Sequence, residues 1–238
     1  MKITLIGYGK MGKVIESIAL ERGHSITYKI GLDNLSELEQ INTENTDVVI
    51  EFTQPESAVQ NILTCFDKQI PVICGTTGWL GEWEKVKKIC DEKNGTLFYA
   101  SNFSLGVNLF FNLNQYLAQL MNNFSNYDSY MEEIHHTEKK DAPSGTAITL
   151  AEGMIEKSTQ KTNWTKGKSD NKDDLSIISL REPNVPGTHS IFYSSEEDTI
   201  EIKHTAHSRK GFALGAVIAA EFSQGKKGII TMKNLLGL

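Results

Sequence analysis

Apolar positions in the first hundred residues follow a repeating pattern. Short strand-like runs, the first almost wholly apolar, are each followed by segments whose apolar residues recur at helical spacing. The strand-like runs are 3–6, 25–30, 47–52, 71–74 and 96–100, and the clearest helical segments are 14–19, 55–63 and 83–89. Strands that alternate with helices over this length predict a parallel, doubly wound sheet.

The pattern changes after residue 104. Helices are expected at 105–121 and 144–157, and strands at 127–136, 175–181, 189–194 and 199–205. The polar segment 158–172 is expected to be a mobile surface loop. A run of strands without intervening helices predicts a mostly antiparallel sheet, whose open face often pairs with another subunit.

The end of the chain is expected to return to the first domain. Residues 211–222 form a predicted helix rich in small residues, and 228–232 add a last strand or pack on its flank. The predicted fold is therefore α/β. Residues 1–104 plus 209–238 form a dinucleotide-binding domain with a Rossmann-type parallel sheet. Residues 105–208 form an α+β domain for substrate binding and oligomerisation, with a mostly antiparallel sheet.

A glycine motif joins the first strand to the first helix. It reads Gly7-Tyr8-Gly9-Lys10-Met11-Gly12, which is GxGxxG in the strand-to-helix position that dinucleotide-binding proteins use. Gly7 would permit the tight turn, Gly9 would let a pyrophosphate approach the backbone, and Gly12 would let the helix pack against the strand. The helix N-terminus would supply N–H donors and partial positive charge to the phosphates.

The end of the second strand leaves the choice between NADH and NADPH open. Asp33 is a candidate ligand for the ribose 2′-hydroxyl, although it lies slightly late and suits a turn or helix cap equally well. Lys29 or Lys10 could instead face a 2′-phosphate.

The ends of the later parallel strands are expected to line the ligand site, because ligands lie beyond the carboxyl ends of such strands. Phe52-Thr53, Gly75-Thr76-Thr77 and Ser101-Asn102-Phe103 fall at those ends. They are candidate walls for the nicotinamide and its ribose, with ordinary loop chemistry as the alternative.

The segment from Glu133 to Ala147 concentrates groups suited to acid chemistry on an anion. His135 and His136 titrate near neutral pH and, as neighbours on a strand, point to opposite faces. Lys139-Lys140 adds positive charge, and Ser144-Gly145-Thr146 precedes a helix whose N-terminus can hold an anion. These groups predict a pocket for a small carboxylate-bearing substrate that must be protonated. No clear third donor accompanies the histidines and HExxH is absent, so no metal site is predicted.

Composition narrows the class of protein. The chain has 238 residues and a formal charge of −6, which argues against a nucleic-acid partner. Three cysteines without a CxxC pair indicate reduced, buried thiols in a cytoplasmic protein. No apolar run approaches the length of a signal-peptide core or a membrane span, so no membrane partner is expected. Of the other histidines, His24, His204 and His207 are expected to be structural, and His189 is a candidate supporting residue.

These motifs together resemble the dihydrodipicolinate reductase family of bacterial lysine and diaminopimelate biosynthesis. The resemblance covers nearly the whole chain, and its most specific part is the HHTEKKDAPSGTA block. The other matching segments are Gly7–Gly12, Glu51-Phe52-Thr53 with Pro55, Gly75–Gly78, Ala100–Ser104, Ser208-Arg209, Phe212-Ala213 and Gly215-Ala216.

The resemblance implies a reductase that uses NADPH or NADH on a cyclic dicarboxylate. Hydride would reach C4 of the substrate, with His135 as the proton donor and Lys139 as its catalytic partner. The implied substrate-binding residues are His136, Ser144, Gly145, Thr146 and Thr77. The implied cofactor-binding residues are Gly7, Lys10, Met11, Gly12, Gly75, Thr77, Ala100 and Phe103. The glycine motif and the strand ends add Gly9, Asp33 and Phe52 to this set. A homotetramer built through the sheet of the second domain is also implied.

Two positions depart from the family pattern, and two other functions are alternatives. Gly31 stands where many members carry an acidic ribose ligand, and Leu214 replaces a frequent Asn. Another two-domain amino-acid dehydrogenase would share the nucleotide-binding half without explaining the HHTEKKDAPSGTA block. A non-catalytic NAD(P)-binding regulator would be expected to lack His135 or Lys139.

Overall fold

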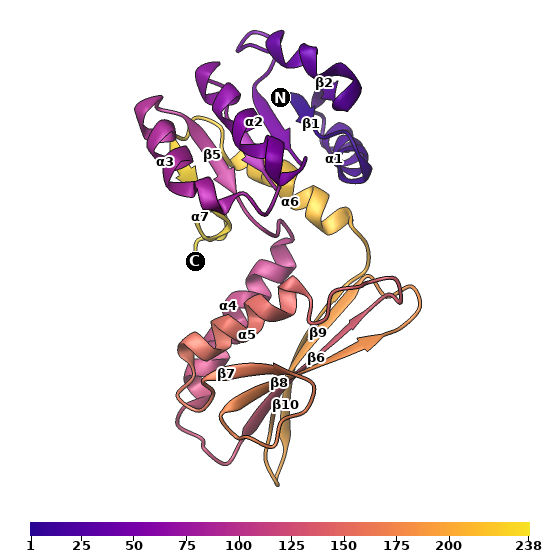
Figure 1. The fold of residues 1–238 in the computed structure, drawn as a ribbon, viewed down its shortest axis with the longest axis vertical. Helices are drawn as coiled ribbons and strands as arrows, with labels where there is room; N and C mark the ends of the chain where they lie inside the picture. Colours follow the sequence, from indigo (N-terminus) through magenta and orange to yellow (C-terminus); the bar gives the residue numbers. More distant parts are fainter. The chain divides into compact units, whose positions relative to one another are not determined.

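The structure, a computed structural model, describes all residues from Met1 to Leu238. The chain forms two compact units (Figure 1). The first unit comprises Met1–Leu105 and Arg209–Leu238, and the second comprises Gly106–Ser208. No helix combines the length and the apolar character needed to cross a membrane.

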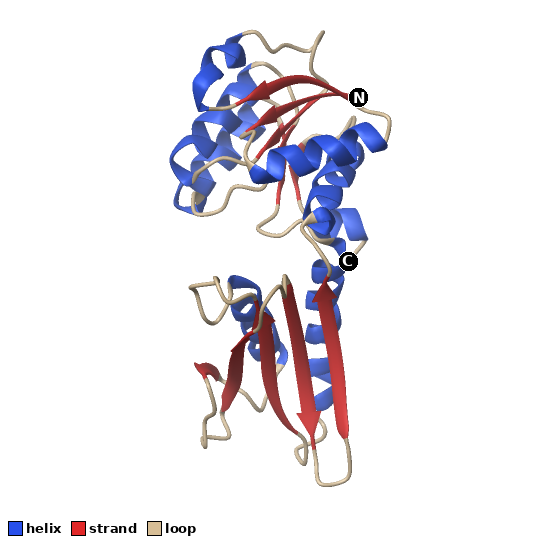
Figure 2. Ribbon diagram, turned by 90° about the vertical axis from the view of Figure 1, so that its right-hand side faces the viewer, coloured by secondary structure: helices blue, strands red, loops and turns tan.

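The first unit is built on a six-stranded parallel sheet with helices on both faces (Figure 2). Its strands, in spatial order, are β2 (Ser25–Ile30), β1 (Lys2–Ile6), β3 (Val48–Glu51), β4 (Val72–Cys74), β5 (Thr96–Tyr99) and β11 (Gly228–Ile230). Its helices are α1 (Lys10–Glu21), η1 (Leu32–Glu39), α2 (Pro55–Asp67), η2 (Leu80–Glu82), α3 (Trp83–Glu92), α6 (Lys210–Phe222) and α7 (Met232–Leu236). The predicted Rossmann-type sheet is confirmed.

Two apolar cores hold this sheet. One lies under α1 and α6 and the other under α2 and α3, so the central strands are buried on both faces. This explains why β1 and β3 are almost wholly apolar in sequence. The strand order reverses between β1 and β3, which is where ligands bind in sheets of this class.

The second unit has a five-stranded mixed sheet. Its strands, in spatial order, are β10 (Thr199–Ala206), β9 (Gly187–Ser194), β6 (Asp128–His135), β8 (Asp174–Arg181) and β7 (Asn163–Lys166). The antiparallel pairs β10/β9 and β9/β6 have longer registers than the parallel pairs β6/β8 and β8/β7. Helices α4 (Leu105–Met121) and α5 (Gly145–Lys157) pack on one face. The predicted α+β unit with a mostly antiparallel sheet is confirmed.

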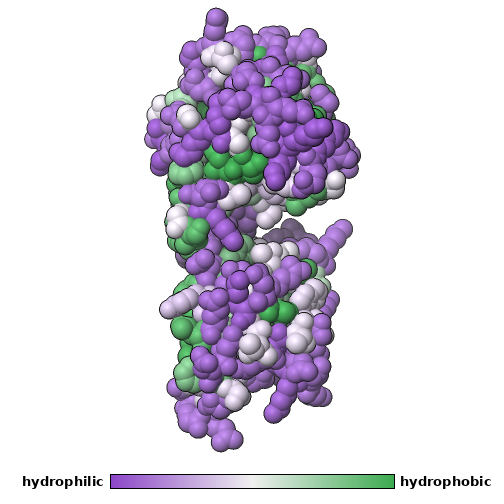
Figure 3. Space-filling view, turned by 90° about the vertical axis from the view of Figure 1, so that its left-hand side faces the viewer, coloured by the Kyte–Doolittle hydropathy of each residue, from purple (hydrophilic) through white to green (hydrophobic).

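The other face of this sheet carries aromatic and aliphatic side chains. Because Met131 points into the core, its neighbour Tyr130 points to the opposite face, where it stacks on Phe192 with ring centroids 4.6 Å apart. Leu180, which follows the same alternation on β8, is half-exposed. On the helix-covered side, Leu109 and Leu113 of α4 are half-exposed as well. The face of the molecule shown in Figure 3 is mostly hydrophilic with a few apolar patches.

The prediction of a mobile surface loop over residues 158–172 is wrong in part. The segment contains β7, and Lys161 is buried with its ammonium 2.7 Å from Asp128 Oδ1. The same ammonium donates to the carbonyl oxygens of Lys172 and Asp174. A short polar strand at the edge of a sheet lacks the apolar pattern from which strands are predicted. A lysine in such a segment is expected to be solvated, and only its three acceptors in the folded chain make its burial favourable.

Candidate functional site

A cavity of about 430 Å³ lies at the carboxyl ends of β1, β3 and β4. Seven residues predicted to bind cofactor line it: Gly7, Gly9, Lys10, Met11, Phe52, Gly75 and Thr77. Four others do not. Gly12 lies beneath the turn, Ala100 and Phe103 are buried in the core, and Asp33 is exposed in η1.

The three motif glycines meet different surroundings. Gly7 has φ +95°, and a Cβ there would lie 2.0 Å from the carbonyl oxygen of Phe52. A Cβ at Gly12 would lie 2.6 Å from the carbonyl oxygen of Gly7. A Cβ at Gly9 would meet no atom within 4 Å, so the fold itself does not require this glycine. Gly9 is also the N-cap of α1, and it has no side chain that could accept from the first-turn N–H groups. These N–H groups therefore face the cavity. The cradle therefore fits a pyrophosphate.

The wall of the cavity is held by buried hydrogen bonds. Glu51 is fully buried and accepts from the Thr53 hydroxyl and, at 3.1 Å, from the Cys74 thiol. Burial and the Glu51 charge raise the pKa of the Cys74 thiol. A Cβ at Gly75 would lie 2.2 Å from the Phe52 ring, so the aromatic wall is packed directly on this glycine. All three cysteines are free and buried, as predicted.

Beside the glycine turn, Lys29 already has a partner. Its ammonium lies 2.5 Å from Glu16 Oε1 and 5.3 Å from the centroid of the Tyr8 ring, and Tyr8 donates to the same carboxylate. Asn34, rather than Asp33, accepts from the Gly31 N–H at 2.7 Å and caps the end of β2.

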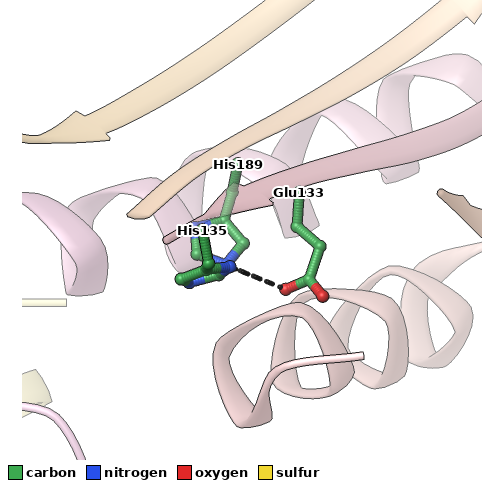
Figure 4. A group of neighbouring side chains, drawn as sticks. All are labelled: Glu133, His135 and His189. Atoms are coloured by element: carbon green, nitrogen blue, oxygen red, sulfur yellow. Dashed lines mark ion pairs between the residues drawn. The ribbon is translucent and has the colours of Figure 1, made fainter. Parts of the chain in front are cut away.

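In the second unit, Glu133, His135 and His189 form a cluster on the helix-covered face of the sheet (Figure 4). Alternation along β6 puts Glu133 and His135 on one face, and His189 is the cross-strand partner of Glu133 on β9. The distance from His135 Nδ1 to Glu133 Oε2 is 3.4 Å, and the two imidazole rings meet edge to face at 5.1 Å. His136 lies just beyond the strand and is half-buried.

Ser144 joins this cluster to α5. Its backbone N–H donates to Glu133 Oε1 at 3.0 Å, and its hydroxyl accepts from the Ala147 N–H and lies 3.1 Å from His189 Nε2. The N–H groups of Gly145 and Thr146 lie in the first turn of α5, where a helix offers no internal acceptor. A Cβ at Gly145 would meet nothing within 4 Å, so this end of the helix is open to an anion.

Lys139 lies on the loop between β6 and α5. Its ammonium is 2.8 Å from each carboxylate oxygen of Asp141. Arg181, at the end of β8, donates to the carbonyl oxygens of Lys139 (3.3 Å) and Asp141 (2.7 Å). The guanidinium therefore fixes the backbone that carries the lysine.

Burial and charge set the protonation of the cluster. Burial tends to raise the pKa of Glu133, but hydrogen bonds from Ser144 and Ser179 and the nearby His135 outweigh it, so that the pKa lies below its ordinary value. Burial lowers the pKa of His135, and the charge of Glu133 opposes this. Burial, assisted by His135, lowers the pKa of His189 to about 4. At neutral pH the cluster therefore holds an anionic Glu133 and a neutral His189.

No third donor was expected beside His135 and His136, but the structure brings Glu133 and His189 to His135, and His136 is not part of this group. Glu133, His135 and His189 place one donor atom each within 4.8 Å of one another. However, the Glu133 oxygens already accept from Ser144 and Ser179, and Arg181 Nη2 lies 3.7 Å from Oε1. We therefore interpret the cluster as a hydrogen-bonded polar network rather than a metal centre.

The buried His189 predicts a loss of stability in acid. An unfolded chain binds a proton at His189 near pH 6.5, whereas the folded chain binds it only near pH 4. Between these values the unfolded state holds more protons, so lowering the pH favours unfolding, by about 3 kcal/mol at pH 4. The free energy of unfolding, measured by urea titration, should fall from pH 6.5 to 4. His189→Gln should flatten this slope, and an unchanged slope would contradict the assignment.

Sequence reasoning missed Glu133, Ser179 and Arg181 as parts of this site. The i, i+2 spacing of Glu133 and His135 on a predicted strand was a usable signal, because such residues share a face. The positions of Ser179, Arg181 and His189 depend on strand pairing, which the sequence alone does not specify.

Comparison with known proteins identifies what this chain resembles. Family models described as dihydrodipicolinate reductase match it twice, the N-terminal model over residues 1–103 and the C-terminal model over residues 106–236. A 4-hydroxy-tetrahydrodipicolinate reductase of Christiangramia forsetii is 50% identical, covering 99% of this chain and 98% of its own. One from Neisseria gonorrhoeae is 33% identical, covering 94% of this chain and 84% of its own.

Solved structures resemble the fold. A dipicolinate-bound dihydrodipicolinate reductase from Paenisporosarcina sp. TG-14 has a TM-score of 0.77 and 20% identity, covering 98% of each chain. An amine dehydrogenase from Mycobacterium smegmatis has a TM-score of 0.61 and 10% identity, covering 98% of this chain and 95% of its own. The two-part architecture is therefore shared with other oxidoreductases.

Proposed function

Because this chain belongs to the dihydrodipicolinate reductase family, we propose that it reduces 4-hydroxy-tetrahydrodipicolinate to tetrahydrodipicolinate with NADPH or NADH. The reaction belongs to lysine and diaminopimelate biosynthesis. The observation that carries the proposal is the segment from β6 to α5, which joins a proton donor, a fixed cation and an open helix N-terminus within one unit.

The first unit would hold the cofactor. The backbone of Gly7, Gly9, Lys10, Met11 and Gly12 would hold the pyrophosphate at the N-terminus of α1. Phe52, Gly75 and Thr77 would surround the nicotinamide and its ribose. Ala100 and Phe103 would support this wall from the core, where the centroid of the Phe103 ring lies 5.7 Å from that of Phe52. Asp33 is the candidate at the adenosine ribose. The bound dihydronicotinamide supplies the hydride, and the protein supplies position and charge.

The second unit would bind the substrate and protonate it. The N–H groups of Gly145 and Thr146 would hold a carboxylate, assisted by His136 and by the charge of Lys139. Ser144 would act mainly as the N-cap that holds the first turn of α5, because its own polar groups already bond to Glu133, Ala147 and His189. The C4 hydroxyl would leave with a C3 proton as water, which gives the conjugated dihydrodipicolinate ring. As hydride then adds at C4, electron density builds toward C3. A protonated His135 beside Lys139 would neutralise this density and give a proton to C3.

We further propose that the enzyme is a cytoplasmic homotetramer that binds neither nucleic acid nor membrane. The open face of the second sheet supports the assembly, because Tyr130 and Phe192 stack there without a covering helix. The formal charge of −6 supports the absence of a nucleic-acid partner.

The proposed reaction is tested by initial rates of NADPH and NADH oxidation at ~340 nm, the absorbance of the reduced nicotinamide. The substrate is made in situ from pyruvate and aspartate semialdehyde by the preceding synthase. Oxidation that depends on the synthase product is expected, and the ratio of the two rates measures the effect of Gly31. Folded protein that binds NADH but oxidises neither cofactor would contradict the proposal and favour a regulatory NAD(P)-binding protein.

A further inference from the structure

Glu133 is a fully buried carboxylate that touches both halves of the substrate-binding segment. We propose that Glu133 is the positioning residue of this site: it holds the Nδ1 side of His135 and the N–H of Ser144 with one carboxylate. The proton donor and the carboxylate-binding turn are thereby kept in a fixed relation. This inference rests on the proposed function and assigns a role to a residue that makes no contact with the reacting atoms.

The contacts of Glu133 account for both of its oxygens. Oε1 accepts from the Ser144 N–H at 3.0 Å and from the Ser179 hydroxyl at 2.8 Å. Oε2 lies 3.1 Å from the Ser144 nitrogen, 3.4 Å from His135 Nδ1 and 3.8 Å from His189 Nε2. A buried charge is costly unless it is hydrogen-bonded and paired, and the bonds from Ser144 and Ser179 meet this requirement for Glu133.

The arrangement selects which nitrogen of His135 gives up its proton. Nδ1 is buried, and it has no hydrogen-bond partner at the observed 3.4 Å from Glu133. Protonation of the imidazole would close this gap into a charge-assisted hydrogen bond. Nε2 points the other way, toward Gly187, where a Cβ would lie only 3.1 Å from it. Because Gly187 has no side chain, the space beside Nε2 stays open. Nε2 is therefore the nitrogen of His135 that can give its proton to the substrate.

The proton transfer balances with these assignments. The Nε2–H bond breaks as the C–H bond at C3 of the substrate forms, and the electron pair of the broken bond stays on Nε2. His135 changes from imidazolium to neutral imidazole and keeps its Nδ1–H on Glu133. Water then returns a proton to Nε2. A carboxylate that holds the far side of a catalytic histidine selects its tautomer and stabilises its charged form.

Glu133 also links His135 to the helix N-terminus. The bond from the Ser144 N–H fixes the residue that caps α5, and the Ser144 hydroxyl is bonded in turn to His189. Movement of the carboxylate would therefore displace both the acid and the N–H groups of Gly145 and Thr146. A misplacement of about 1 Å at such a site can lower the rate about 100-fold.

The charged groups that face His135 come from every neighbouring element. Lys139 and Arg181 lower its pKa, whereas Glu133 and Asp141 raise it. His189, on β9, is neutral at the pH of interest. Removing the charge of Glu133 leaves the two cations opposed only by Asp141, so the pKa of His135 should fall further.

The test is Glu133→Gln, with Glu132→Gln as the matched control on the opposite face of β6. Glu133→Gln should lower kcat about 100-fold and leave the Kd for NADPH within about twofold. The decline of kcat with rising pH, which follows deprotonation of His135, should begin at lower pH in this variant. Glu133→Asp, which keeps the charge, should restore much of this pH profile. Glu132→Gln should match the wild type.

A second measurement does not require activity. An NMR titration of the histidine Cε1 signals, with His135 assigned by His135→Gln, should show a lower His135 pKa in Glu133→Gln than in the wild type. A folded Glu133→Gln variant with unchanged kcat and an unchanged His135 titration would overturn the inference. A wild type without reductase activity would instead overturn the proposed function, and the titration would still report on the positioning role.

Discussion

Replacing Lys139 with alanine should lower kcat by about 100- to 1000-fold and leave the affinity for NADPH nearly unchanged. The ammonium lies on the loop after β6 and is the cation proposed to neutralise charge on the substrate. Removing one preorganised group that stabilises the charge developing in a transition state typically lowers kcat by this factor. The cofactor cradle belongs to the first unit and does not contain this residue.

Lys140→Ala is the control for this experiment, because Lys140 is the exposed neighbour on the same loop. Initial rates give kcat and KM for each variant, and quenching of tryptophan fluorescence gives the Kd for NADPH. Loss of Lys139 also removes the hydrogen bond that lowers the pKa of Asp141. A Lys139→Ala variant with wild-type kcat would remove this lysine from the mechanism.

Gly9→Ala should separate cofactor binding from folding. A methyl group there meets no protein atom, so the free energy of unfolding should stay within about 0.5 kcal/mol of the wild type. The same methyl group would occupy the space through which the pyrophosphate approaches the backbone, so the Kd for NADPH should rise about 100-fold.

Gly7→Ala is the contrasting variant. Its Cβ would lie 2.0 Å from the Phe52 carbonyl oxygen at a φ of +95°, so the turn must shift. This variant should lose about 2 to 4 kcal/mol of stability together with cofactor affinity. Thermal unfolding with and without NADPH measures both effects. Equal stability of the two variants, or tight NADPH binding by Gly9→Ala, would contradict the assigned cradle.

Much of the fold could be predicted because its signals are local. The helix expected at 105–121 is α4 residue for residue, and Ser144 caps α5 as its position before an apolar-periodic segment suggested. Leu214, an unexplained departure in sequence, packs against the core beneath α6. Leu214 is partly buried there, and removing apolar surface from water favours a leucine at this position.

The supporting residues of the site could not be predicted in the same way. Ser179 reaches Glu133 from 46 positions later in the chain, through the parallel pairing of β6 and β8. Parallel register depends on how the whole sheet assembles, and a shift of one residue would turn Ser179 to the other face. The burial of Lys161 within the segment expected to be a mobile loop has a related cause, since its three acceptors belong to Asp128, Lys172 and Asp174, which lie elsewhere along the chain.

The first unit is completed only by residues 209–238, which follow the whole second unit in sequence, and this has a consequence for biosynthesis on the ribosome. Helix α6 packs against α1, where Arg22 and His24 both bind Glu221, and β11 completes the sheet beside β5. A Cβ at Gly215 would lie 1.7 Å from the Phe103 carbonyl oxygen, so α6 also packs directly against the segment after β5. A nascent chain therefore leaves the part of the sheet that α6 covers exposed until residues 209–238 have been synthesised. The contiguous second unit can fold while that face still needs protection by chaperones.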